Sequence, residues 1–255
     1  MRLDVVVPCY GQHKLTHRLL ASFAAYAPEW ARLVLVDNAR GLPQIPRPPS
    51  GRLPRARIEI RNSENLGFVR AVNQGICASD AEYLCIQNND TEIFRGCYEQ
   101  LLSDLLAYDL AAISPVASEG GSAWLSIDQM QKMWDWYAVD LPERHIDRAR
   151  YLREAGWDPG VYAAGMIPFF CTLMPRTTID RVGLLDPRFG LGLGDDDDYC
   201  KRIRDADLKA GFSLSTYVYH KGRATFDANF TPAQIEAMAA RNKAAFNAKH
   251  GTDWV

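Results

Sequence analysis

Short apolar runs alternate with amphipathic segments along the first 114 residues, and this alternation most constrains the fold. Leu3–Val7 and Leu33–Val36 are mostly apolar and β-branched, which is typical of buried strands. Between them Leu15, Leu19 and Phe23 recur four residues apart, which predicts one apolar helix face. Because parallel strands need a crossover between them, repeated strand–helix units predict an α/β fold. Its mostly parallel sheet should carry helices on both faces.

The same patterns predict the remaining elements. We expect further strands at 57–60, 83–87, 110–114, 169–174 and 212–219. We expect helices over 68–76 and 101–106, and others beginning near 177, 195 and 232. Pro43–Pro54 holds five prolines and one glycine, so it is expected to be a surface connection without regular structure.

The segment between residues 118 and 168 departs from this pattern. Its apolar residues are irregularly spaced, and it is rich in tryptophan: Trp124, Trp134, Trp136 and Trp157. We therefore expect a second lobe or lid there rather than more sheet.

Composition bounds the class of protein. At 255 residues with a formal net charge of −2, the chain is near the upper end of a single domain. This charge gives no support to a nucleic-acid partner. The N-terminus is expected to be a first strand rather than a signal peptide, and no apolar run is long enough to span a membrane. The six cysteines show no CxxC spacing, which favours free thiols in a cytoplasmic protein.

The strand beginning at Tyr83 ends in a cluster of polar residues, Asn88, Asn89 and Asp90. Ligands bind at the carboxyl ends of strands in open α/β sheets. Oxygen ligands of this kind suit Mn²⁺ or Mg²⁺ together with substrate phosphates. The alternative is a polar turn, which the same residues also favour.

Two other strands end in residues that could bind a ligand. Asp37 and Asn38 follow the second strand, where a carboxylate could accept hydrogen bonds from a ribose or a base; the alternative is an Asx turn. His220 ends the strand at 212–219 and could bind a metal, with Lys221 and Arg223 placed for a diphosphate. The alternative is a structural or exposed histidine.

Four consecutive acids, Asp195–Asp198, are expected to open a helix, where they complement its dipole. Successive helical residues point about 100° apart, so we expect only one or two to face a shared cleft and supply a general base. The alternative is a solvated helix start paired with Lys201, Arg202 and Arg204. The preceding Gly190–Gly194 loop is expected to be mobile and able to close over a ligand.

Taken in order, these segments resemble the inverting GT-A glycosyltransferases of family 2, especially rhamnosyltransferase-like bacterial members. Gly11 stands where the family usually has Asn, and Val72 stands where many members have Arg. The resemblance covers nearly the whole chain and rests on these segments: Val5–Tyr10, Val34–Ala39, Asn65–Gly75, Ile86–Glu92, Asp180–Phe189, Asp195–Arg202, Tyr217–His220 and Asn242–Gly251.

The resemblance implies a GT-A fold, in which a Rossmann-like, mostly parallel sheet carries a small acceptor lobe. Residues 1–115 would form the nucleotide-sugar-binding half, and 116–168 an acceptor lobe or lid. Residues 169–230 would hold the acidic motif and complete the sheet, and 231–255 would form a C-terminal helix.

The resemblance also implies roles for individual residues. Asp90 and His220 would bind Mn²⁺ or Mg²⁺. Asp196 would be the catalytic base with Asp195 beside it. The nucleotide-sugar donor would be held by Pro8, Tyr10, Asp37, Asn65, Asn73 and Asn88.

The implied activity is metal-dependent transfer, with inversion, from a UDP-, dTDP- or GDP-linked sugar to a hydroxyl acceptor. A bacterial glycan or glycoconjugate would be that acceptor, and a lipid-linked one would require peripheral contact with a membrane. Two alternatives stay open: a non-catalytic protein that binds nucleotide sugars or glycans, and a glycosyltransferase acting on modified nucleic acid.

Overall fold

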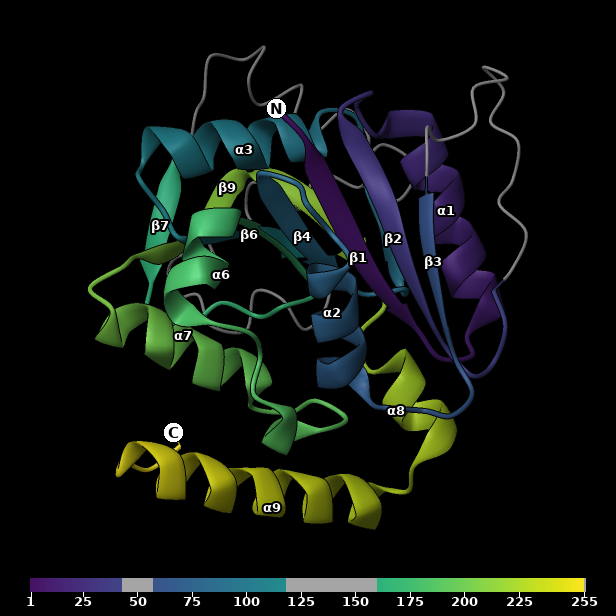
Figure 1. Ribbon diagram of the computed structural model, residues 1–255, viewed down its shortest axis with the longest axis vertical. Coiled ribbons are helices and arrows are strands. Elements are labelled where there is room, and N and C mark those ends of the chain that lie inside the picture. Colours follow the sequence, from purple (N-terminus) through teal and green to yellow (C-terminus); the bar gives the residue numbers. More distant parts are fainter. Residues whose placement is uncertain (43–56, 118–159, 255) are drawn as a thin grey trace, which may run out of the picture.

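A nine-stranded mixed sheet forms the centre of the computed structural model, which describes residues 1–42, 57–117 and 160–254 (Figure 1). The strand order is β3-β2-β1-β4-β8-β6-β9-β5, and β7 also pairs with β9. The strands are β1 Leu3–Cys9, β2 Ala31–Asn38, β3 Arg57–Asn62, β4 Tyr83–Gln87, β5 Thr91–Glu92, β6 Ala112–Ala117, β7 Val161–Ala164, β8 Cys171–Pro175 and β9 Ala210–His220.

The N-terminal half of the sheet is parallel, as the alternation predicts. β1 lies between β2 and β4, with Val5 opposite Leu33 on one side and Cys85 on the other. Every residue of β1 is buried, because helices cover both faces. The crossovers are α1 (His13–Tyr26) and α2 (Phe68–Cys77).

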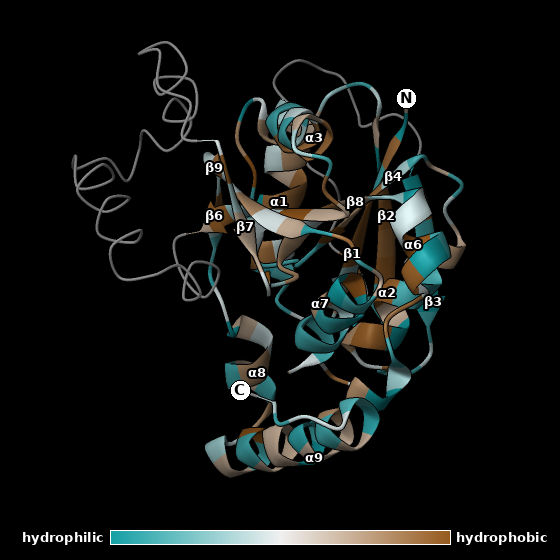
Figure 2. Ribbon diagram, turned by 90° about the vertical axis from the view of Figure 1, so that its left-hand side faces the viewer, coloured by the Kyte–Doolittle hydropathy of each residue, from teal (hydrophilic) through white to brown (hydrophobic). Residues whose placement is uncertain are grey.

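The two faces of the sheet have separate cores. Val5 and Val7 point to the side covered by α1 and α3 (Cys97–Ala107), whereas Val6 points to the side covered by α2. The second side also carries α6 (Arg176–Val182), α7 (Asp195–Asp205) and α9 (Pro232–His250). Figure 2 shows brown, apolar β2 behind α6 and α7, which are coloured mostly teal.

β8 runs antiparallel between β4 and β6, so the sheet is mixed at this point. β7 lies antiparallel to β9, with Val161 opposite Ser213. We expect no strand between residues 118 and 168, and this is wrong for Val161–Ala164. The irregular spacing of apolar residues in this segment does not indicate a strand. The tryptophan-rich part of the expected lobe and the proline-rich connection lie outside the described residues.

The helix starts agree with the sequence patterns. α7 begins at Asp195, and α9 begins after Thr231, whose hydroxyl accepts a hydrogen bond from the N–H of Gln234 (3.3 Å). Leu106 is an exception within α3, because its side chain is 58% exposed instead of packing in the core. Among the described residues no helix has the length and apolar character needed to cross a membrane. The six cysteines are free, and five of them are buried.

This topology gathers several strand ends at one edge. Parallel β1, β2 and β4 end there at Cys9, Asn38 and Gln87. The short β5 pairs with the end of β9, so that Thr91 lies opposite His220. A short helix, α8 (Ala224–Asn229), follows β9 and leads to α9.

Candidate active site

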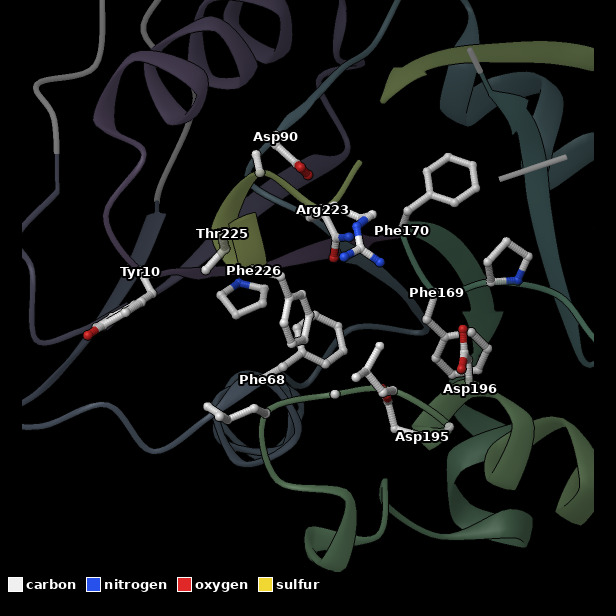
Figure 3. Close-up of a pocket in the computed structure, with 18 of the residues that line it drawn as sticks. Tyr10, Phe68, Asp90, Phe169, Phe170, Asp195, Asp196, Arg223, Thr225 and Phe226 are labelled. Carbon is white, nitrogen blue, oxygen red and sulfur yellow. The ribbon is translucent and has the colours of Figure 1, made fainter. Parts of the chain in front are cut away.

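A cavity of about 440 Å³ opens at this edge of the sheet (Figure 3). It is formed by the strand ends, by the loop before α7 and by the segment from His220 through α9. Most of the residues proposed from sequence line it: Pro8, Tyr10, Asn65, Asn88, Asp90, Asp195, Asp196 and His220. Asp37 and Asn73 do not.

At one end of the cavity Asp90 and His220 lie together. The Oδ1 atom of Asp90 is 3.3 Å from Nε2 of His220, and each residue is 7% exposed. Nδ2 of Asn88 is 3.4 Å from the same imidazole nitrogen. The ring stacks on Phe170 at 4.8 Å, and the N–H of Lys221 donates to the Asp90 carbonyl (3.0 Å). Backbone pairing and ring stacking thus fix both side chains.

The chemistry of this end fits a divalent cation. Oδ1 of Asn88 is buried and has no hydrogen-bond partner among the described residues. An amide oxygen, a carboxylate and an imidazole together suit Mn²⁺ or Mg²⁺ supplemented by substrate oxygens. The described part of the chain contains no group of three His, Cys, Asp or Glu residues placed for a metal, so a cation at this end would also have to draw on the Asn88 amide.

At the other end α7 presents three carboxylates, Asp195, Asp196 and Asp197, to the cavity. Burial raises the pKa of Asp195 to about 7, and the charges of Asp197 and Asp198 add to this shift. Burial, followed by the charge of Asp195, also raises the pKa of Asp196 well above its usual value. A carboxylate whose pKa approaches neutrality can accept a proton from a hydroxyl group near pH 7.

Asp198 has a different role. It is fully buried, and its carboxylate pairs with Arg202 (2.9 Å), Lys249 (2.6 Å) and His250 (2.8 Å). It therefore cannot serve as the base. The alternative of a solvated acidic helix start holds only for the pairing of Asp198 with Arg202, because Asp198 is buried and the other three acids line the cavity.

Apolar side chains separate the two polar ends, as Figure 3 shows for Phe68 and Phe226. Arg223 also lines the cavity, with its backbone in the left-handed region at φ 55°. The sequence patterns did not select the apolar residues of the cavity, because these residues come together only in the folded chain. The apolar lining includes Phe68, Phe169, Phe170, Leu191, Leu193, Phe226, Phe230, Ile235 and Trp254.

Tyr10 lies at the strand end of β1, beyond Pro8. Its ring packs under the guanidinium of Arg40 (4.9 Å), and its hydroxyl accepts a hydrogen bond from Nη2 of Arg40 (2.9 Å). Asn65 turns the chain into α2, since its Oδ1 accepts a hydrogen bond from the N–H of Gly67 (3.0 Å).

The structure does not bring Asp37 into the cavity. Its Oδ1 accepts hydrogen bonds from the N–H groups of Arg40 (3.1 Å) and Gly41 (3.0 Å), so it stabilises the turn after β2, although three and four residues on rather than the two of an Asx turn. Asn38 lines the cavity in its place.

Asn73 also lies outside the cavity. Its amide donates to the carbonyl of Leu185 (2.8 Å) and accepts from the N–H of the same residue (3.0 Å). Asn73 therefore holds the segment that leads to α7, and the structure gives it no direct place at a nucleotide.

Comparisons with known proteins point to glycosyltransferases as well. The model of a family described as Glycosyl transferase family 2 matches residues 4–181. N-acetylglucosaminyl-diphospho-decaprenol L-rhamnosyltransferase of Mycobacterium tuberculosis is 28% identical over 250 residues, covering 88% of this chain and 77% of the relative. An uncharacterized protein of Mycobacterium bovis is 28% identical over 239 residues, covering 89% and 77%.

Among solved structures, GalNAc-T7 with UDP, GalNAc and Mn²⁺ superposes with a TM-score of 0.60 at 15% identity. The match covers 86% of this chain but spans only 43% of the GalNAc-T7 chain. This likeness shows that the α/β fold is of the GT-A type. Since the family model covers well over half of the sequence, the chain belongs to glycosyl transferase family 2.

Proposed function

We propose that this glycosyltransferase is inverting and metal-dependent, and that it transfers a sugar from a nucleotide-diphosphate donor to a hydroxyl acceptor. One observation carries the proposal. A single cavity has Asn88, Asp90 and His220 at one end and the carboxylates of Asp195–Asp197 at the other. The first group suits a metal-bound diphosphate, and the second suits a base for the acceptor.

The donor would lie along the strand ends. Pro8, Tyr10 and Asn65 would contact the nucleoside, and Arg223 would approach the diphosphate as a charged hydrogen-bond donor. Asn88, Asp90 and His220 would hold the divalent cation. When bound, the cation would neutralise charge that develops on the leaving nucleoside diphosphate. GalNAc-T7, which shares the fold, was crystallised with UDP and Mn²⁺, which supports this arrangement.

Asp196 would act as the general base. Its carboxylate would take the proton of the acceptor hydroxyl while the acceptor oxygen forms a bond to the anomeric carbon. The bond from that carbon to the phosphate oxygen would break at the same time, and the electron pair would leave with the nucleoside diphosphate. Attack opposite the leaving group inverts the anomeric configuration. Asp195 lies beside Asp196, and its charge would tune the pKa of the base.

The substrate classes follow from the relatives and the cavity. The mycobacterial relative is named a rhamnosyltransferase, which supports a rhamnosyl or other hexosyl donor and an acceptor that is a glycan or glycoconjugate. Aromatic rings in the cavity would pack against sugar faces. The free thiols favour action in the cytoplasm.

The test is a panel of UDP-, dTDP- and GDP-linked sugars, assayed for nucleoside diphosphate release with Mn²⁺, with Mg²⁺ and with EDTA. Candidate acceptors are added in parallel. We expect one donor to give acceptor-dependent release that EDTA abolishes. Tight donor binding without nucleoside diphosphate release in the presence of any acceptor would instead favour a binding protein. Transfer that resists EDTA would contradict the metal assignment.

A further inference from the structure

The loop that leads into the acidic helix has an unusual backbone. Four of its residues lie in the positive-φ region: Gly190 (54°), Gly192 (112°), Leu193 (72°) and Gly194 (87°). Of these four residues Leu193 is not a glycine, and a bulky side chain at such a φ is strained. Asp195 follows immediately, so the direction in which α7 presents its acids depends on the shape of this loop.

Asn242 on α9 holds that loop. Its side chain is fully buried, and Nδ2 donates to the carbonyls of Gly192 (2.8 Å), Leu193 (2.8 Å) and Phe189 (3.2 Å). The orientation of the amide is fixed, because Oδ1 accepts hydrogen bonds from Nε (3.1 Å) and Nη2 (3.0 Å) of Arg241. The glycines predict a mobile loop, and these hydrogen bonds restrain the path that it takes in this structure.

Other contacts restrain the same unit from outside the loop. The N–H of Val69 on α2 donates to the carbonyl of Gly190 (3.1 Å). Lys249 near the end of α9 joins Asp186 (2.8 Å) to Asp198 (2.6 Å). Within the described residues, the carboxylate of Asp195 also accepts a hydrogen bond from the backbone of Leu193, whereas Asn242 ties Gly192 and Leu193 to α9.

We propose that Asn242 is a positioning residue for glycosyl transfer, which holds the strained Phe189–Gly194 loop in the shape that aims Asp195 and Asp196 into the cavity. The inference rests on the proposed function in that it concerns the same carboxylates. Asn242 lies outside the cavity lining, so it acts through the loop. An amide at this position is required because a carboxylate cannot donate to the three carbonyls.

The main test compares wild type with Asn242→Asp, which keeps the shape of the side chain but removes the donor. Hydrogen exchange of the 189–198 amides is measured without substrate, and kcat and the donor KM are measured by nucleoside diphosphate release. Because small misplacements of catalytic groups are costly, we expect kcat to fall by about 10–100-fold. We expect faster exchange in the loop and a donor KM within about threefold of wild type, since the donor end is separate.

Two further variants separate positioning from general stability. Thr231→Ala removes the N-cap of α9, which destabilises that helix but leaves the loop contacts intact. We expect its kcat to match wild type. Arg241→Leu frees the Asn242 amide without emptying the core; it should lower kcat by a few-fold, and it tests the idea even if Asn242→Asp does not fold.

A rescue experiment addresses the strain directly. Glycine adopts the backbone of residue 193 without strain, so Leu193→Gly should restore part of the kcat lost in Asn242→Asp. An unchanged kcat in Asn242→Asp, or an equal loss in Thr231→Ala, would overturn the proposal. If wild type shows no transfer with any substrate, the proposed function fails, and the exchange measurement still decides whether Asn242 holds the loop.

Discussion

The Asp90 carboxylate lies 3.3 Å from Nε2 of His220, although the two residues are 130 positions apart in the sequence. The pairing of β5 with the end of β9 brings them together. Both side chains are almost fully buried at the wall of a cavity. The proposed metal site rests on this pair together with Asn88, and each residue can be tested by substitution.

Loss of either partner should therefore weaken metal binding strongly. Loss of even an outer-shell partner reduces metal affinity by about 10–100-fold, so we expect Asp90→Asn and His220→Ala each to weaken Mn²⁺ affinity by at least about 100-fold. Isothermal titration with Mn²⁺ and nucleotide measures this. His17→Ala, an exposed histidine on α1, is the control and should bind as wild type does. Equal Mn²⁺ affinity in all four proteins would refute the assignment.

Arg223 should contribute to binding of the donor diphosphate. A hydrogen bond to a charged group is worth about 1.5–3 kcal/mol, so Arg223→Ala should raise the donor KM by roughly 10–100-fold. Steady-state kinetics with varied donor would show this. Lys201→Ala removes a cation that pairs with Asp205 and does not line the cavity, so its donor KM should be unchanged. A normal donor KM in Arg223→Ala would exclude this role.

The pH profile of transfer should report the coupled acids of α7. Burial raises the pKa of Asp195 to about 7 and raises that of Asp196 as well, and a base must be ionised to accept a proton. Activity should therefore increase with pH along an acid limb that lies above the usual range of a carboxylate. Asp195→Asn removes a negative charge that raises the pKa of Asp196, so the acid limb of the kcat profile should move to lower pH. A shift to higher pH would contradict this coupling.

Gly67 should be needed for the loop before α7 to pack. A Cβ atom there would lie 2.6 Å from the carbonyl oxygen of Gly190, whereas one at Gly41 would meet nothing within 4 Å. Both glycines have positive φ, 84° and 78°, so Gly41→Ala gives the cost of an alanine at positive φ without a clash, about 1 kcal/mol.

Gly67→Ala should cost about 1–3 kcal/mol more than Gly41→Ala, the range expected for overpacking. It should also reduce kcat, because the added methyl group would displace the loop that leads into α7. Chemical denaturation of the two variants gives the comparison. Equal destabilisation would show that the loop accommodates the added methyl group without strain.

The sequence predicted the strands and helices well where their apolar periodicity was strong. Leu15, Leu19 and Phe23 identified α1, and the acids at 195–198 marked the start of α7. The same patterns carry no information about strand direction, so the antiparallel course of β8 and the place of Val161–Ala164 in the sheet were not foreseen.

The candidate site was predicted in part. Asp90 and His220 stand at the ends of apolar strands and Asp196 lies in the run of four acids, and all three line one cavity. Asp37 and Asn73 could not be sorted from ligand-binding residues, because only the folded chain shows the backbone N–H groups that their side chains contact. Trp254 reaches the cavity from the end of the chain, through a tertiary contact that no local pattern reveals.

Turnover by Asp196→Asn tests most directly whether Asp196 is the general base. General base catalysis contributes about 10²–10⁴-fold, so we predict that kcat falls by a factor in this range while Mn²⁺ and donor affinities stay at wild-type values. Asp195→Asn should retain more activity than Asp196→Asn. If Asp196→Asn instead turned over within tenfold of wild type, the base assignment and the proposed direction of attack would be contradicted.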